Sequence, residues 1–111
     1  MRGDMVHLTQ REEQILLAIW KLREEAYLVA IKKHLSGILG RDWNVGAIHR
    51  PLRHLETQGL IESHWGEATA KRGGRAKKIY SITIEGYALL AAYKKINDSL
   101  WDRFPDLGST G

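Results

Sequence analysis

The chain has 111 residues, a length that fits one domain with a modest core. Its hydrophobic fraction of 43% and charged fraction of 27% are typical of a soluble globular protein. It contains no cysteine, which excludes disulfides, thiolate zinc sites and cysteine catalysis. No apolar run approaches the ~18 residues of a membrane span, and no signal-peptide core follows the first residues. We therefore expect a cytoplasmic protein without a membrane partner.

The positive charge is concentrated in one part of the chain. The net charge is +4, and residues 41–78 hold eight basic and four acidic residues, which accounts for the whole excess. The stretches before and after, 1–40 and 79–111, carry +1 and −1 and so cancel. A basic excess confined to one region indicates a polyanionic partner such as nucleic acid, with a solvated basic face as the alternative.

Two amphipathic helices are predicted first. Thr9 and Glu12 have the spacing of a capping box, which predicts a helix over residues 10–23. A second apolar stretch with helical spacing predicts another helix over residues 27–39, with Gly40 as its stop.

A third helix is predicted after Asn44, which is a good N-cap. Its apolar positions share one face: Val45, Ile48, Leu52 and Leu55. Pro51 lies inside this segment, where it lacks an N–H and clashes with the preceding turn, so we expect the helix to kink or to start late. Gly59 is expected to end it.

Two strands and a last helix complete the predicted order. Residues 60–65 and 78–83 have strand-like composition, and the Gly- and Lys/Arg-rich stretch 66–77 between them predicts a hairpin loop. A long amphipathic helix follows to Phe104, where Pro105 closes the run. Its apolar stripe is Leu89, Tyr93, Ile96, Leu100 and Phe104. We expect residues 105–111 to form a disordered tail.

This order of elements predicts a mainly α fold with a two-stranded β wing. The expected architecture is a winged helix-turn-helix over residues 8–83 with a C-terminal dimerisation helix over 84–104, in one domain spanning 1–111. In such folds the second helix of the helix-turn-helix enters the DNA major groove, and the hairpin loop touches flanking phosphate or the minor groove.

The predicted DNA-binding residues fall in two groups. The third helix offers Asn44, Gly46, Ala47, His49, Arg50 and Arg53 to base edges and nearby phosphates. The wing offers Lys71, Arg72, Gly73, Gly74, Arg75, Lys77 and Lys78 to the DNA backbone. The alternatives are a surface helix with two solvated arginines and a flexible solubilising loop, and the coincidence of both features in one fold favours DNA.

The last helix predicts a homodimer. We expect its N-terminal half to pack on its own chain and its far end to reach a second subunit. The predicted interface residues are Trp20, Leu89, Tyr93, Ile96, Leu100, Trp101 and Phe104. The alternative is that the whole helix packs within its own chain. Trp43 and Trp65 are expected to be packing residues near the third helix and the wing base.

No pattern in the sequence indicates catalysis or metal binding. His49 and His54 are five residues apart and so do not share a helical face, and no arrangement of nucleophile and base stands out. We therefore expect no enzyme activity, no metal and no cofactor.

Several short motifs resemble one known family. They are Glu25-Ala26-Tyr27, Gly46-Ala47-Ile48, Leu52, Leu55-Glu56, Gly59-Leu60-Ile61, Trp65-Gly66-Glu67, the basic string from 72 to 78, Tyr80, and Thr83 with Gly86. From Leu8 to about Phe104 the chain resembles the PadR-like transcriptional regulators, in particular short members with a single C-terminal helix. The resemblance implies a homodimeric repressor that binds a partly palindromic operator.

The resemblance fails at the positions that would read bases. His49 stands where the family usually has Tyr, Arg50 stands where Pro often follows that Tyr, and Leu28 stands where Gly is frequent. These departures concern the family's base preference and leave the DNA-binding mode that the resemblance implies. A small-molecule effector at the dimer centre, near Trp101, is a regulatory variant of this function, and a winged-helix module that binds another protein instead of DNA is the rival.

Overall fold

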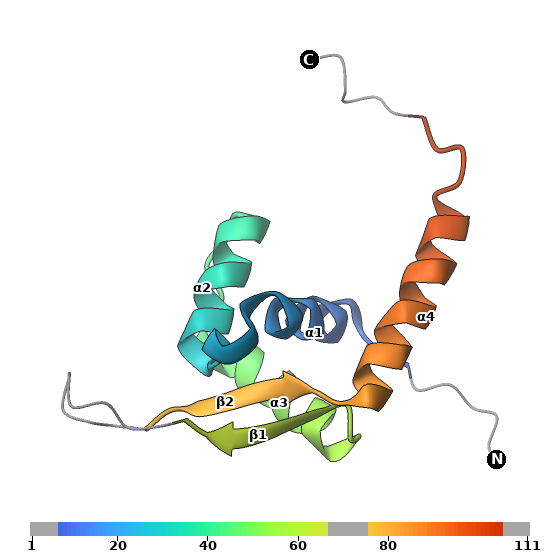
Figure 1. Ribbon diagram of the computed structural model, residues 1–111. Coiled ribbons are helices and arrows are strands. Elements are labelled where there is room, and N and C mark those ends of the chain that lie inside the picture. Colours follow the sequence, from blue (N-terminus) through green and yellow to red (C-terminus); the bar gives the residue numbers. More distant parts are fainter. Residues whose placement is uncertain (1–6, 67–75, 106–111) are drawn as a thin grey trace.

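The computed structural model describes residues 7–66 and 76–105. Its elements are α1 (Gln10–Leu22), a 3₁₀ turn (Arg23–Glu25), α2 (Leu28–Leu39), α3 (Val45–Thr57), β1 (Ile61–Trp65), β2 (Lys78–Ile82) and α4 (Ile84–Leu100). Figure 1 shows α1 and α2 above the two strands and α3 behind them, with α4 rising from the end of β2 at one side. The predicted order of three helices, a two-stranded wing and a last helix is confirmed.

The capping box at the start of α1 is present as predicted. Thr9 Oγ1 accepts a hydrogen bond from the Glu12 amide at 3.1 Å, and the Thr9 amide donates to Glu12 Oε1 at 2.9 Å. The helix ends at Leu22, one residue earlier than expected, because Arg23 adopts φ of 53° and leaves the right-handed helical region.

Gly40 ends α2, as the sequence predicts. Its φ of 72° is left-handed, a conformation that glycine adopts without steric cost, and its amide donates to the Ser36 carbonyl at 3.0 Å. The helix begins at Leu28, with the extended Tyr27 as its N-cap residue.

The helix α3 begins where Asn44 caps it. Asn44 Oδ1 accepts from the Ala47 amide at 2.8 Å, so the late start suggested by Pro51 is wrong. Because Pro51 has no N–H, it gives the Ala47 carbonyl no intrahelical partner. Tertiary burial compensates: Ile48, Leu52 and Leu55 are almost wholly inaccessible to solvent.

The core lies between the first three helices and the inner side of the hairpin. Its buried apolar members are Ile15, Leu16, Ala18, Ile19, Ala26, Ile31, Leu35, Trp43, Ile48, Leu52, Leu55, Leu60, Ile61 and Tyr80. Val45 was expected on the buried face of α3 but is exposed, because Trp43 supplies the buried side chain at this end of the helix.

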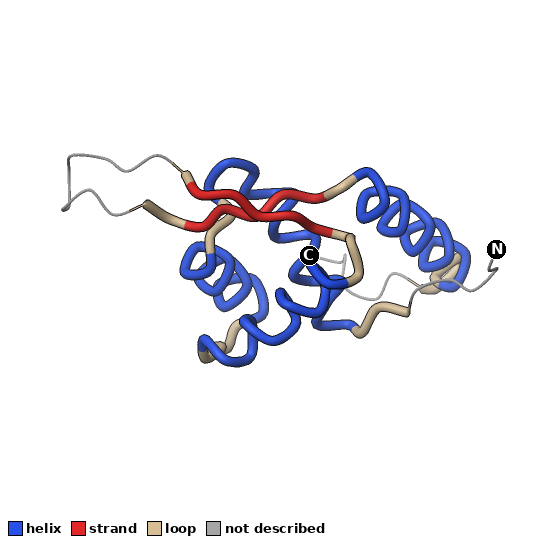
Figure 2. Tube along the Cα trace, turned by 90° about the horizontal axis from the view of Figure 1, so that it is seen from below, coloured by secondary structure: helices blue, strands red, loops and turns tan. Residues whose placement is uncertain are grey.

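The strands β1 and β2 form an antiparallel pair. Its register runs from Ile61 opposite Ile82 to Trp65 opposite Lys78. Figure 2 shows the two paired strands twisting about each other along one side of the helices. The segment before α2 adds a short pairing, because the Tyr80 amide donates to the Ala26 carbonyl at 2.9 Å. This anchors the wing to the helix-turn-helix.

Both strands are shorter than predicted. Leu60 and Thr83 lie outside them: the Thr83 amide still donates to the Leu60 carbonyl at 3.1 Å, but Thr83 serves as the N-cap of α4. The expectation that Trp65 packs at the wing base is wrong: its side chain is 70% exposed, since β1 ends beyond the edge of the core. The loop residues 67–75 lie outside the described part of the chain.

The start of α4 is fixed tightly against the hairpin. Thr83 Oγ1 accepts from the Gly86 amide at 3.0 Å and donates to the Gly59 carbonyl at 2.7 Å. Gly86 is buried, and a Cβ added there would lie 2.2 Å from the Leu60 carbonyl oxygen. Only glycine allows the helix to approach the chain this closely.

The end of α4 corrects the predicted boundary. The helix stops at Leu100 rather than Phe104, and the chain turns at residues 101–103, where Arg103 has φ of 65°. Every residue from 94 to 105 is exposed, and in Figure 1 this half of α4 stands clear of α1 and α2. Of the predicted tail, residues 106–111 lie outside the described part of the chain.

Candidate nucleic-acid interface

The outer face of α3 carries two exposed arginines. Arg50 and Arg53 are exposed on the side of the helix away from the buried Ile48, Leu52 and Leu55. Among the described residues, neither guanidinium makes an ion pair. Their donors are therefore open to a ligand, and a guanidinium can bond both acceptors of a guanine edge or a phosphate.

The N-terminal turn of α3 supports a close approach. Gly46 is exposed without a side chain, Ala47 is half-buried and His49 is exposed. Asn44 is also exposed, but its side-chain oxygen is occupied by the cap on Ala47, so only its amide group is free to donate outward. The exposed hydrogen-bonding side chains of this helix face that are not used in the cap are therefore those of His49, Arg50 and Arg53.

Two cations mark the base of the wing. Lys77 Nζ lies 4.0 Å from the centroid of the Tyr27 ring, and Lys78 Nζ lies 5.9 Å from that of Tyr80. Both lysines are exposed. The remaining predicted wing residues, Lys71, Arg72, Gly73, Gly74 and Arg75, lie outside the described residues.

Polar contacts join α3 to the wing. Glu56, on the last turn of α3, accepts a hydrogen bond from Ser63 Oγ of β1 at 2.7 Å. Burial raises the pKa of Tyr80 on β2, and the nearby Glu56 carboxylate adds to the rise. The last turn of α3 is therefore tied to the wing by a direct side-chain contact.

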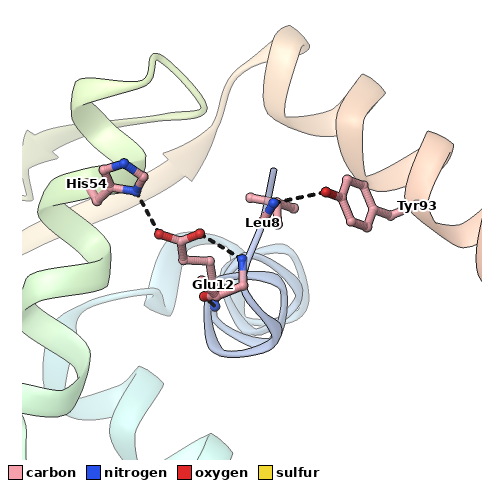
Figure 3. A network of polar contacts seen from close by, with 5 residues as sticks. Leu8, Glu12, His54 and Tyr93 are labelled. Carbon is pink, nitrogen blue, oxygen red and sulfur yellow. Dashed lines mark hydrogen bonds and ion pairs between the residues drawn. The ribbon is translucent and has the colours of Figure 1, made fainter. Parts of the chain in front are cut away.

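A residue that the sequence analysis left out of the site is held directly behind it. His54 Nδ1 lies 2.6 Å from Glu12 Oε2, across from α3 to α1 (Figure 3). Nothing in the spacing of the sequence signals this pair, because 42 residues separate its members.

The predicted dimer residues divide into two groups. Leu89 packs against the core and Tyr93 is half-buried, and the Tyr93 hydroxyl accepts from the Leu8 amide at 2.9 Å. The others are exposed: Trp20, Ile96, Leu100, Trp101 and Phe104. The expectation that only the first half of α4 packs on its own chain agrees with these exposures.

Two of these exposed side chains, Trp20 and Trp101, line an open groove between α1 and α4. Its volume is about 640 Å³, and Leu17, Trp20, Leu90 and Trp101 line it. Trp20 packs on Tyr87 with ring centroids 5.8 Å apart, and Trp101 packs edge-on to Phe104 at 4.9 Å. A surface with this many exposed aromatic rings is typical of an interaction site.

Two kinds of feature are not found in the described residues. In the ranges 7–66 and 76–105, no three His, Cys, Asp or Glu side chains gather as metal ligands would. Within the same ranges, no helix combines the length and apolarity needed to span a bilayer.

Comparison with solved structures finds the same fold in transcriptional regulators. RosR of H. salinarum matches with a TM-score of 0.70 and 25% identity, over 93% of this chain and 86% of that one. A PadR family transcriptional regulator from Eggerthella lenta DSM 2243 matches with a TM-score of 0.64 and 30% identity, over 91% and 86%. A transcriptional regulator from Thermoplasma acidophilum shares the fold at 18% identity, with a TM-score of 0.58 and coverage of 86% and 96%. No curated protein matches the sequence.

The family model for "Transcriptional regulator PadR-like family" matches residues 15–92. This range begins in α1, contains α2, α3 and the wing, and ends in α4. The matched region includes the arginine-bearing face of α3 and both lysines at the wing base. On the strength of this match, the chain belongs to the PadR-like family of transcriptional regulators.

Proposed function

We propose that the protein is a cytoplasmic transcriptional repressor that binds a palindromic DNA operator as a homodimer. The observation that carries this proposal is the pair of exposed arginines, Arg50 and Arg53, on the outer face of α3. A helix that follows a short turn from α2 and presents exposed guanidinium groups has the geometry for reading a major groove.

Membership of the family fixes the class of activity. PadR-like proteins are transcriptional regulators that bind DNA, and the chain is a regulator rather than an enzyme. The residues that contact DNA are our proposal. His49, Arg50 and Arg53 read base edges, and Asn44, Gly46 and Ala47 allow the helix end to approach.

The wing supplies sequence-independent affinity. Lys77 and Lys78 are exposed at its base, and Lys71, Arg72 and Arg75 precede them in the sequence beside Gly73 and Gly74. Each lysine or arginine that neutralises a phosphate releases condensed counterions, so affinity falls as salt rises. The wing therefore grips the backbone while α3 discriminates between sequences.

The exposed end of α4 supports dimerisation. Ile96, Leu100, Trp101 and Phe104 leave apolar area in water that a second copy would cover, together with Trp20 of α1. A two-fold dimer presents two copies of α3 about one DNA turn apart, which suits a palindrome.

Selection of bound sequences from random duplex DNA tests the proposal. We expect an enriched motif with two-fold symmetry and an affinity that falls steeply between low and high salt. Enrichment of no sequence, with no salt-sensitive binding, would favour the rival function, a winged-helix module that binds another protein.

The groove beside Trp101 favours an added regulatory function. A small aromatic cation seated between Trp20 and Trp101 would couple effector binding to the dimer. Titration of the protein with such a cation should quench tryptophan fluorescence, and a Trp101→Leu variant should lose most of that quenching. Equal quenching in the variant excludes this site.

A further inference from the structure

A chain of hydrogen bonds crosses the molecule from α4 to α3. The Tyr93 hydroxyl accepts from the Leu8 amide at 2.9 Å, and the neighbouring Thr9 amide donates to Glu12 Oε1 at 2.9 Å. Glu12 Oε2 then meets His54 Nδ1 at 2.6 Å. Figure 3 shows the Glu12 carboxylate between His54 and the chain segment that Tyr93 holds. We call Tyr93, Glu12 and His54 the relay.

The centre of the relay is buried. The Glu12 side chain is 8% exposed, and each of its two carboxylate oxygens has a hydrogen-bond partner. A buried carboxylate is strongly destabilised when a partner is removed, whereas a fully bonded one is tolerated. Displacing either α3 or the start of α1 would leave a buried oxygen unpaired, so the relay holds both in a single position.

The ends of the relay lie at functionally separate places. His54 follows Arg53 directly and lies one helical turn after Arg50, behind the face that presents these arginines. Tyr93 lies one turn after Leu89, which packs on the core, and directly before the wholly exposed stretch from 94 to 100. The relay therefore links the base-reading helix to the last packed turn of the projecting helix.

We propose that Tyr93, Glu12 and His54 are positioning residues that set the direction of α4 relative to α3. In the homodimer this direction fixes the distance between the two recognition helices, and so the spacing of half-sites that the protein accepts. The consequence for DNA rests on the proposed function, whereas the fixed angle between α4 and α3 does not.

The first test needs no DNA. Because the chain has no cysteine, Thr57→Cys and Lys95→Cys introduce one spin label on α3 and one on α4. Both positions are exposed. The distance distribution between the labels is measured in full-length protein diluted with unlabelled chain, so that only distances within one chain contribute.

The variants separate the relay from general stability. Tyr93→Phe removes one hydroxyl, and we expect the distance distribution to broaden. Glu12→Ala removes both central bonds and should broaden it further, whereas Glu12→Gln keeps an acceptor for Thr9 and a donor for His54 and should restore the narrow distribution. Tyr87→Phe is the matched control on the same helix, because it keeps the ring that packs on Trp20. An unchanged distribution in Tyr93→Phe overturns the proposal, even if Glu12→Ala fails to fold.

The second test uses the duplex selected from random DNA and a version with one base pair inserted at its centre. The wild-type protein should bind the longer duplex more weakly than the selected one. In Tyr93→Phe the ratio of these two affinities should be about fivefold smaller, because one hydrogen bond of about 1 kcal/mol corresponds to about fivefold in an equilibrium constant. Binding to a single half-site should stay unchanged. If wild-type and Tyr93→Phe protein lose the same affinity for the longer duplex, the inference about half-site spacing is wrong. If no duplex is selected at all, the proposed function is wrong, but the distances between the spin labels still test the angle between α4 and α3.

Discussion

Replacing Gly86 with alanine should destabilise the fold sharply, although alanine is the better helix former. The added Cβ would lie 2.2 Å from the Leu60 carbonyl oxygen and 2.9 Å from Ile82 Cγ2. Normal contact distances exceed 3 Å, so the start of α4 must move by about 1 Å away from the hairpin.

The cost follows from what that movement disturbs. The Leu60 carbonyl accepts from the Thr83 amide at 3.1 Å, and the Gly86 amide donates to Thr83 Oγ1 at 3.0 Å. Weakening both bonds costs about 1 kcal/mol each, and the overpacking adds about 1–3 kcal/mol. The better helix propensity of alanine returns about 1 kcal/mol. The free energy of unfolding should therefore fall by about 2–4 kcal/mol.

Urea unfolding followed by tryptophan fluorescence measures this change at one fixed protein concentration, because a dimer's stability depends on concentration. Gly37→Ala is the matched control: Gly37 lies inside α2 with nothing within 4 Å of an added Cβ. That variant should gain about 0.5–1 kcal/mol. If Gly86→Ala is as stable as the wild type, the close approach of α4 to Leu60 is not a feature of the folded protein.

Four further substitutions test the surfaces and the core. Arg53→Ala should change which bases are preferred and reduce the binding free energy for the selected duplex by about 1–3 kcal/mol. Lys78→Ala should instead weaken binding to all duplexes alike and lower the slope of log affinity against log salt by about 1. Equal effects of both substitutions on every duplex would contradict the division of roles between α3 and the wing. Leu100→Glu should raise the dissociation constant of the dimer at least about tenfold, as measured by sedimentation velocity. Leu100 is 75% exposed, so the new charge would be buried only between subunits. An unchanged dissociation constant would place the interface elsewhere. Because burial raises the pKa of Tyr80 above its ordinary value of 10.0, the unfolded state loses this proton first. This group should therefore leave the free energy of unfolding unchanged below about pH 10 and lower it above that pH. In the Tyr80→Phe variant the free energy of unfolding should decline less steeply with pH. An identical decline in the variant and the wild type would mean that other groups cause it.

Local signals in the sequence predicted most of the fold. The Thr9 and Glu12 capping box, the Gly40 stop and the Asn44 cap depend on neighbours within four residues, and all three appear as expected. The order of elements was predicted from the spacing of apolar residues, which is visible in the sequence because each helix buries one face. The exposed arginines on α3 were predicted from the same periodicity.

Boundaries and long-range contacts were harder to predict. The apolar spacing of α4 continues to Phe104, but the helix ends at Leu100 and the chain turns at residues 101–103, where Arg103 adopts a left-handed φ of 65°. Trp65 was expected to pack because it is large and apolar, whereas the strand carries it past the core. The pair of Glu12 and His54 depends on how α1 crosses α3, which no local pattern encodes.

Pro51 has a consequence for how the protein loses its activity. A segment with a proline at its centre and few residues on either side does not form a helix alone in water. The shape of α3 is therefore supplied by the domain that buries Ile48, Leu52 and Leu55. A peptide of residues 45–57 would carry the same arginines without the means to present them. Heating or denaturant should abolish sequence recognition and tertiary structure in one transition, with no partly unfolded form that still reads DNA.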